Sequence, residues 1–267
     1  MIYLFLLSTL FPLQDGIQLS INHQEKTYRH IVSLSLADEI DLYADKEVNW
    51  VVYKPIFREY DNLTKGAHSL AEIDYELEVL SATPTKHISL DLPPGTHYLG
   101  FVENKVPPSL STSLPLHLTN AHIVQLVVRE EDSYVGFLTE LLGLPFILPP
   151  KLVGIYGHQT DLRVGTDCAE LAIYGARRIG YDIPYGGPRG ILDYLVPTNE
   201  LKKGTIIHYG FQVSVLYEDR GVIGELDEED LLIHAYGDRV AIQKLGDIEL
   251  AKKGYKLYKW KFRLEVQ

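Results

Sequence analysis

The sequence predicts an α+β protein in which an antiparallel β-sandwich is followed by a helix that packs on a second antiparallel sheet. Three observations support this. From residue 17 to 129, short segments alternate apolar and polar residues between turn signals. Near residue 130, apolar residues begin to recur at helical spacing, and after residue 205 short alternating segments return. We therefore expect a β-sandwich domain over residues 17–129 and an α+β domain over residues 130–267.

The first sixteen residues, MIYLFLLSTLFPLQDG, contain an apolar run from Ile2 to Leu13. This run is too short to span a bilayer, and it is typical of the core of a signal peptide. We predict that residues 1–16 are a signal peptide and that the protein is exported, periplasmic or extracellular, and bacterial in type. A buried first strand is the alternative. No later segment approaches ~20 consecutive apolar residues, so we expect no membrane span in the mature chain.

The composition indicates which kinds of binding partner and cofactor are not expected for this chain. The chain carries 25 Lys and Arg against 36 Asp and Glu, which gives a formal net charge of -11. An acidic chain is not expected to bind nucleic acid or anionic membrane surfaces. Its ten histidines are dispersed and lack metal-ligand spacing, and no glycine-rich phosphate loop follows a strand. We therefore expect neither a metal nor a nucleotide or other cofactor.

The predicted sandwich consists of six alternating segments separated by turns. The segments are GIQLSIN, RHIVSLSLA, EVNWVVYKPIF, YELEVLS, HISLDLPPGTHYLGFVEN and AHIVQLVVRE, and the turn signals are Asp45 with Lys46, Asn62, Pro84, Pro93 to Gly95, and Pro107 with Pro108. Repeated short strands at this spacing favour a small antiparallel sandwich.

The second half begins with helical patterns and ends with strands. The segment SYVGFLTELLGL predicts a helix that stops at Gly143, and TDCAELAIYGARRIG predicts a second helix, capped by Asp167 and ended by Gly180. The strands expected after it are GTIIHYG, FQVSVLYED, DLLIHAYGD, RVAIQKLGD and KLYKWKFRLEV. This order predicts a helix on an antiparallel sheet.

Cys168 is the only cysteine, so the chain cannot form an internal disulfide. It lies where the second helix begins, and a helix N-terminus favours the thiolate through its free N–H groups. Cys168 is therefore a candidate nucleophile. The alternative for a lone cysteine is a small apolar residue of the core.

The segments TDCAEL, LKKGTIIHYG, FQVSVLYED and LLIHAYGD together resemble the NlpC/P60 family of cell-wall cysteine peptidases, over roughly residues 142–247. The resemblance implies a papain-like domain with Cys168 as nucleophile, Asp167 beside it, His234 as the orienting residue and Tyr156 near the oxyanion site. It also implies a peptide or peptidoglycan stem peptide as substrate. His158, ten residues before Cys168, could line the same cleft, and an ordinary loop histidine is its alternative.

The sequence departs from the family pattern at the catalytic base, whose position holds Gln212. Glutamine cannot accept the proton of a thiol. Three interpretations remain open: His208 is the base, although it lies roughly 13 Å from Gln212 along a continuous strand; His234 pairs directly with Cys168, while Gln212 orients it or donates to an oxyanion; or the centre is degenerate. The sequence thus predicts an exported cysteine hydrolase, with a non-catalytic binding protein for peptidoglycan fragments or a partner peptide as the alternative.

Overall fold

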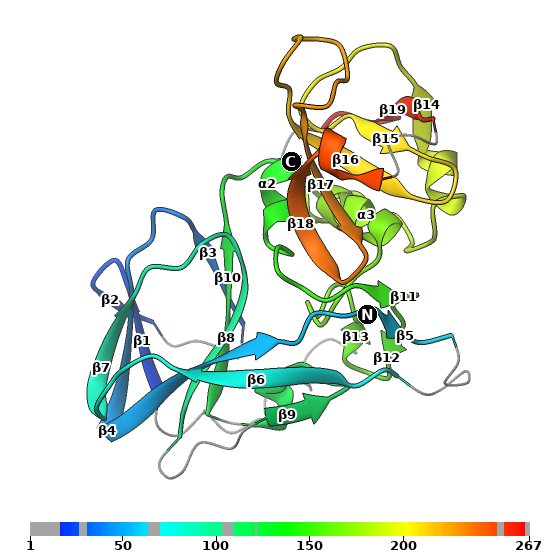
Figure 1. The fold of residues 1–267 in the computed structure, drawn as a ribbon. Coiled ribbons are helices and arrows are strands. Elements are labelled where there is room, and N and C mark those ends of the chain that lie inside the picture. Colours follow the sequence, from blue (N-terminus) through cyan, green and yellow to red (C-terminus); the bar gives the residue numbers. More distant parts are fainter. Residues whose placement is uncertain are drawn as a thin grey trace, which may run out of the picture.

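The computed structural model describes residues 17–26, 31–63, 70–102, 109–120, 122–249 and 254–264. The predicted signal peptide, residues 1–16, lies outside the described residues. Within them the protein is a mixed α+β structure in which strands dominate (Figure 1). This agrees with the prediction that the protein is an α+β structure rich in strands.

The first half is a nine-stranded sheet with one short helix. Strands β2, β1, β4, β8, β10 and β3 follow one another across it, β6 and β7 also pair with β4, and β9 pairs with β6. The elements are β1 (Ile17–Ile21), β2 (Gln24–Lys26), β3 (Ile31–Ser35), β4 (Ile40–Pro55), β6 (Ile73–Val79), β7 (Thr85–Leu90), β8 (Gly95–Val102), β9 (Ser109–Thr112), α1 (Leu116–Thr119) and β10 (Ile123–Arg129).

The long strand β4 differs from the expectation of a turn at Asp45 and Lys46. The strand continues through these residues, and its register with β7 shifts between Tyr43 and Val48, so the turn-forming residues occupy an irregularity within one strand. The sheet is also not antiparallel throughout, because β3 pairs with β10 in parallel. Leu19, Leu42, Trp50 and other buried residues of this half form one apolar cluster.

The second half contains α2, α3 and a six-stranded sheet in the order β14-β19-β15-β16-β17-β18. The five predicted strands are confirmed, and the last one lies between β14 and β15 in the sheet. The elements are α2 (Tyr134–Thr139), β12 (Leu152–Val153), β13 (Gly157–His158), α3 (Cys168–Arg178), the 3-10 helix η1 (Gly190–Tyr194), β14 (Leu195–Pro197), β15 (Ile206–His208), β16 (Val213–Glu218), β17 (Leu231–Tyr236), β18 (Arg239–Lys244), the 3-10 helix η2 (Leu245–Asp247) and β19 (Lys256–Trp260).

Helix α3 packs on one face of this sheet, over β16 and β17. Because side chains alternate along a strand, the two faces can be assigned from the core clusters. Val215 and Ile233 belong to the cluster that contains α3. Leu216 and Leu232 belong to a separate cluster on the opposite face. These two faces decide which candidate residues can meet Cys168.

The two halves share buried contacts. The strands β5 (Tyr60–Asp61) and β11 (Ile147–Leu148) form a small parallel sheet that joins them. Tyr98 of β8 donates a hydrogen bond to the carbonyl of Arg163 at 3.0 Å, and Thr96 donates to the carbonyl of Glu140 at 2.7 Å. A buried cluster also contains side chains of both halves, including Tyr75, Ile147 and Val164. The halves are therefore packed against each other through buried groups.

Candidate functional site around Cys168

Helix α3 begins at Cys168, and Asp167 is its N-cap, as predicted. The Asp167 carboxylate accepts hydrogen bonds from the backbone N–H groups of Ala169 at 3.0 Å and Glu170 at 2.9 Å. These bonds satisfy two of the free donors at the start of the helix. The cap therefore fixes where the thiol lies relative to the sheet.

The Cys168 side chain is buried, with 5% of the residue exposed, inside the cluster between α3 and the sheet. Burial, followed by the charge of the neighbouring Asp167 carboxylate, raises the pKa of the Cys168 thiol to about 12, against the N–H groups of Val213 and Ala169, which lower it. The expected stabilisation of a thiolate at the helix N-terminus is thus outweighed by desolvation. The thiol is neutral at physiological pH.

His234 does not lie on the face of the sheet that carries Cys168. Its neighbours Ile233 and Ala235 point toward α3, so the His234 side chain points to the opposite face. There its Nε2 atom lies 2.9 Å from Oε1 of Gln243, and burial lowers its pKa. The structure does not bring His234 and Cys168 together.

His208 lies on the same face as α3, because it is the register partner of Val213, whose side chain belongs to the cluster that contains α3. Both of its ring nitrogens are engaged elsewhere. The Nε2–H group donates to the carbonyl of Pro188 at 2.7 Å, and Nδ1 accepts from the N–H of Gly210 at 3.0 Å. Both ring nitrogens of His208 therefore already have hydrogen-bond partners, and neither is directed at Cys168.

Gln212 is buried at the start of β16, and its amide joins two strands. Its Nε2 atom donates to the carbonyl of Ala235 at 2.9 Å. A glutamine at this position therefore satisfies a backbone carbonyl of β17. This hydrogen bond is a structural role for Gln212 that involves no proton transfer.

His158 lies beside the first turn of α3. Its Nδ1 atom is 3.4 Å from Oε2 of Glu170, and Thr160 donates to the same carboxyl oxygen at 2.8 Å. Burial, followed by the charge of Asp167, raises the pKa of Glu170 to about 9. Burial also lowers the pKa of His158. At neutral pH this pair is therefore a neutral imidazole beside a protonated carboxyl.

Three side chains continue from His158 toward the surface as a polar stack. The ring of Tyr185 stacks on His158 with centroids 4.3 Å apart, and the guanidinium of Arg177 lies 4.9 Å from the Tyr185 centroid. Asp161 accepts from the Tyr185 hydroxyl at 2.6 Å and lies 3.5 Å from Arg177. We call His158, Tyr185, Arg177 and Asp161 the polar stack. It presents a half-buried aromatic ring and both signs of charge along α3, from its first turn, beside His158, to its last turn at Arg177.

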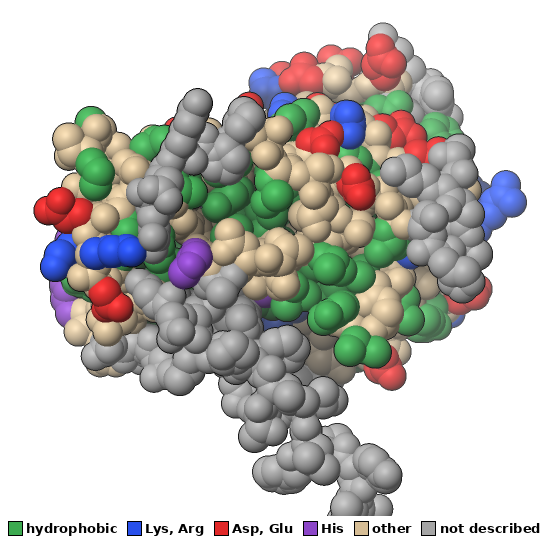
Figure 2. Space-filling view, turned by 90° about the horizontal axis from the view of Figure 1, so that it is seen from below, with side chains coloured by type: hydrophobic (Ala, Val, Ile, Leu, Met, Phe, Trp, Pro, Cys, Tyr) green, Lys and Arg blue, Asp and Glu red, His purple; other side chains and the backbone are tan. Residues whose placement is uncertain are grey.

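Tyr156 is not part of this cluster. It lies at the turn between β12 and β13, where its residue is 44% exposed, together with exposed Leu152 and Ile155. Over the described residues, no hydrogen bond joins Tyr156 to Cys168 or Gln212. On the face of the molecule drawn in Figure 2, hydrophobic side chains are exposed between polar and charged ones. The implied oxyanion role of Tyr156 has no counterpart in these contacts.

Sequence reasoning missed the buried carboxylate of Glu140, which follows α2 directly. Glu140 is fully buried and accepts hydrogen bonds from Arg163 at 3.1 Å, from Arg178 at 2.9 Å and from the hydroxyl of Tyr174. The only sequence signal was an acidic residue within the apolar pattern FLTELLG. Its partners lie on other segments, so the pattern alone could not identify them.

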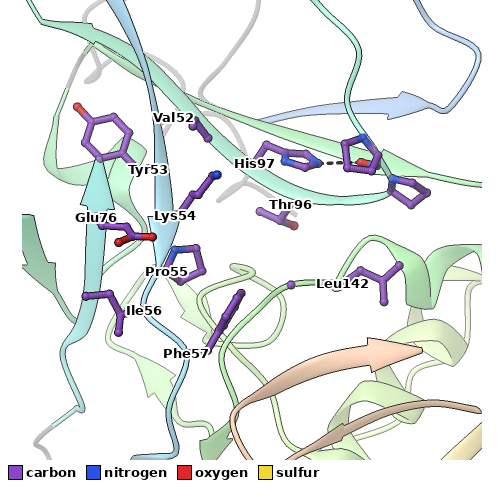
Figure 3. A pocket seen from close by; sticks show the side chains of 13 residues that line it. Val52, Tyr53, Lys54, Pro55, Ile56, Phe57, Glu76, Thr96, His97 and Leu142 are labelled. Atoms are coloured by element: carbon purple, nitrogen blue, oxygen red, sulfur yellow. Dashed lines mark hydrogen bonds between the residues drawn. The ribbon is translucent and has the colours of Figure 1, made fainter. Parts of the chain in front are cut away.

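Two clefts lie away from Cys168. The larger, of about 580 Å³, lies between β4 and the segment after α2 and is lined by Tyr53, Lys54, Phe57, Glu76, His97 and Leu142 among others (Figure 3). In it, Nε2 of His97 lies 2.8 Å from the carbonyl oxygen of Pro93. The second cleft, of about 420 Å³, lies beside η1 and the strands β15 and β19.

Comparison with known proteins adds no assignment: no family model, no curated protein and no solved structure matches this chain. In the described part of the chain, no three or more His, Cys, Asp and Glu side chains are grouped so that they could hold a metal ion. No helix there is long and apolar enough to cross a membrane.

Proposed function

We propose that residues 130–267 form a binding module that has the architecture of a cysteine hydrolase and does not cut its ligand. The observation that carries this proposal is the environment of Cys168, a buried thiol whose pKa is raised to about 12. The resemblance to NlpC/P60 peptidases suggests a peptide or peptidoglycan fragment as ligand. The apolar N-terminal run is compatible with export to the compartment where such ligands occur.

Cysteine hydrolysis needs a thiolate, a base within hydrogen-bond reach and a group that orients the base. Here desolvation disfavours the thiolate, Gln212 occupies the implied base position, and its amide is bonded to Ala235. His234 points to the other face of the sheet, and Nδ1 of His208 accepts from Gly210. The site therefore lacks a thiolate, a base within reach of the thiol and a group that orients such a base.

The polar stack is the surface on which such a module would hold a peptide. It runs along α3 from His158, beside the first turn, to Arg177 in the last turn, and it offers an aromatic face, a carboxylate and a guanidinium within a few ångströms of one another. Peptides present termini of both charges, which Asp161 and Arg177 could pair with. Binding by this surface needs no ionised thiol.

The first test is the rate at which iodoacetamide alkylates Cys168. Because Cys168 is the only cysteine, Cys168→Ser gives a complete blank, and the urea-unfolded chain gives the rate of a free thiol. At about pH 8 we expect the native protein to react about tenfold or more slowly than the unfolded chain, since only an exposed thiolate reacts. Fast labelling near neutral pH that disappears in His208→Ala or His234→Ala would restore the hydrolase interpretation.

The second test separates binding from cutting. Purified protein is incubated with a soluble peptidoglycan stem peptide, and both complex formation and cleavage are followed. We expect binding without products, and the same affinity in Cys168→Ser. Arg177→Gln should weaken binding about tenfold, which is the usual size of a charge-assisted contact. Products that are absent with Cys168→Ser would show that the proposal is wrong.

A further inference from the structure

The cleft of about 420 Å³ beside η1 lies on the same face of the sheet as α3. His208, Lys256 and Tyr258 contribute to it from β15 and β19, and these three share that face because His208 pairs with Lys256 and Tyr258 pairs with Ile206. Ile206 belongs to the α3 cluster. The cleft therefore opens on the helix-bearing side of the sheet.

One wall of this cleft is fixed by a buried hydrogen bond. His208 donates from Nε2 to the carbonyl of Pro188 at 2.7 Å, and Arg189, the next residue, lines the cleft. The His208 residue itself is 7% exposed. The buried His208 side chain thus fixes the backbone at Pro188. Because Arg189 is the next residue, its backbone is held in place as well, although its side chain is exposed.

The charges that line the cleft have one sign. Arg189 and Lys256 are the Arg and Lys residues that line it, and no Asp or Glu lines it. Over the described residues, neither cation takes part in any of the ion pairs of the structure, which include those of Lys54, Arg163, Arg177, Arg178 and Lys244. Two unpaired cations in one cleft of a chain with net charge -11 favour an anionic ligand.

The remaining walls are aromatic. Tyr258 meets the His208 ring edge to face with centroids 5.8 Å apart, and Tyr209 meets Tyr255 in the same manner at 6.4 Å. Tyrosines provide flat apolar faces together with hydroxyl groups that can exchange hydrogen bonds. Such walls suit a ring compound that carries several hydroxyl groups. A cleft of about 420 Å³ is in the size range of small-ligand sites.

We propose that this cleft binds a small acidic sugar, with its carboxylate or phosphate held by Arg189 and Lys256 and its ring against Tyr255 and Tyr258. Neither Cys168 nor any residue of the polar stack lines this cleft, so the proposal does not require Cys168 to be catalytic. The larger cleft of Figure 3 supports no comparable ligand class, because it contains Lys54 and Glu76 and its lysine is already paired with Glu78.

The test is titration calorimetry of the full chain with glucuronate, glucose 6-phosphate and glucose. Glucuronate and glucose 6-phosphate separate a carboxylate ligand from a phosphate ligand, and glucose has the same ring without charge. We expect at least one acid to bind about tenfold or more tightly than glucose, since a charge-assisted pair contributes at least that factor. Arg189→Gln and Lys256→Gln should each lower the affinity of the protein for that acid by about tenfold.

Lys259→Gln is the matched control, because Lys259 lies on the same strand as Lys256 and its side chain points to the other face of the sheet. It removes the same charge and should leave the affinity unchanged. Equal binding of all three compounds, no binding of either acid, or an affinity that Arg189→Gln and Lys256→Gln do not change would each overturn the proposal. The three substituted side chains, those of Arg189, Lys256 and Lys259, are exposed, so the variants should fold, and circular dichroism checks this.

Discussion

Two carboxyl groups lie in the first turn of α3 and its cap, where they would repel each other if both were ionised. Burial raises the pKa of Asp167 to about 6, against its hydrogen bonds to the N–H groups of Glu170 and Ala169. Burial, and then the charge of Asp167, raises the pKa of Glu170 to about 9, against the hydrogen bond from Thr160. The folded protein therefore retains protons that the unfolded chain loses near pH 4.

This difference predicts a stability that falls as pH rises. A carboxyl whose pKa is raised on folding stabilises fully below its unfolded pKa, and that contribution is lost as pH rises toward the folded pKa. Above about pH 7.5 His158 is neutral in both the folded and the unfolded state, because its pKa is near 6.5 in the unfolded chain and lower in the folded protein. Between about pH 7.5 and about 9, the raised pKa of Glu170 should therefore lower the free energy of unfolding by up to about 1.4 kcal/mol per pH unit.

The measurement is urea unfolding of wild type and Glu170→Gln at several pH values in this window. We expect Glu170→Gln to become increasingly more stable than wild type as pH rises. Glu225→Gln, an exposed residue in the loop before β17, is the control and should follow wild type. A constant difference between Glu170→Gln and wild type across the window would contradict a protonated Glu170.

The sequence predicted the helix cap at the start of α3, but it did not predict which residues surround Cys168 in the folded protein. An aspartate before an apolar helical pattern is a local signal, and the cap it predicted is present. The burial of Cys168 depends on β16, which comes much later in the chain, so no local pattern reports it. The same holds for His234, because the face it occupies depends on strand pairing.

Helices α2 and α3 are joined by the charge network of Glu140. Its carboxylate lies between Arg163 and Arg178, and the hydroxyl of Tyr174 donates to it. The two arginines hold the pKa of Glu140 below its usual value against the opposing effect of burial. Since this carboxylate is fully buried, its loss would leave the buried Arg163 guanidinium and the partly buried Arg178 guanidinium without it.

Glu140→Gln should therefore lower the free energy of unfolding by about 3–5 kcal/mol, the usual effect of breaking a buried ion pair. Glu131→Gln is the matched control, because Glu131 pairs with Lys203 while both are half-exposed, and it should cost no more than about 1 kcal/mol. Urea unfolding measures both. Similar losses in the two variants would mean that the Glu140 network does not hold the helices together.

At the level of elements, the strands with clear alternation were the most predictable. The five segments expected after α3 are all strands, because each has an apolar face that must be buried. The turn expected at Asp45 and Lys46 was wrong, because β4 is paired on both sides of these residues and the pairing overrides local turn preference. The position of β19 between β14 and β15 was not predictable from its own pattern.

Across the whole molecule, the contacts between the halves predict cooperative unfolding. Gln125 donates to the Tyr98 hydroxyl at 3.1 Å, Tyr98 donates to the carbonyl of Arg163, and Arg163 reaches Glu140. These groups are buried, so separating the halves would expose or orphan several of them at once. We therefore expect the halves to unfold in one transition.

The two tryptophans allow this to be measured, because Trp50 lies in the core of the first half and Trp260 in that of the second. In Trp260→Phe the fluorescence reports Trp50 alone, and in Trp50→Phe it reports Trp260 alone. Each buried replacement lowers stability, so the comparison is made within each variant, between fluorescence and far-UV circular dichroism in urea. We expect one midpoint for both signals in each variant. Separate midpoints would mean that the shared contacts are too weak to couple the halves, and that each half is a folding unit of its own.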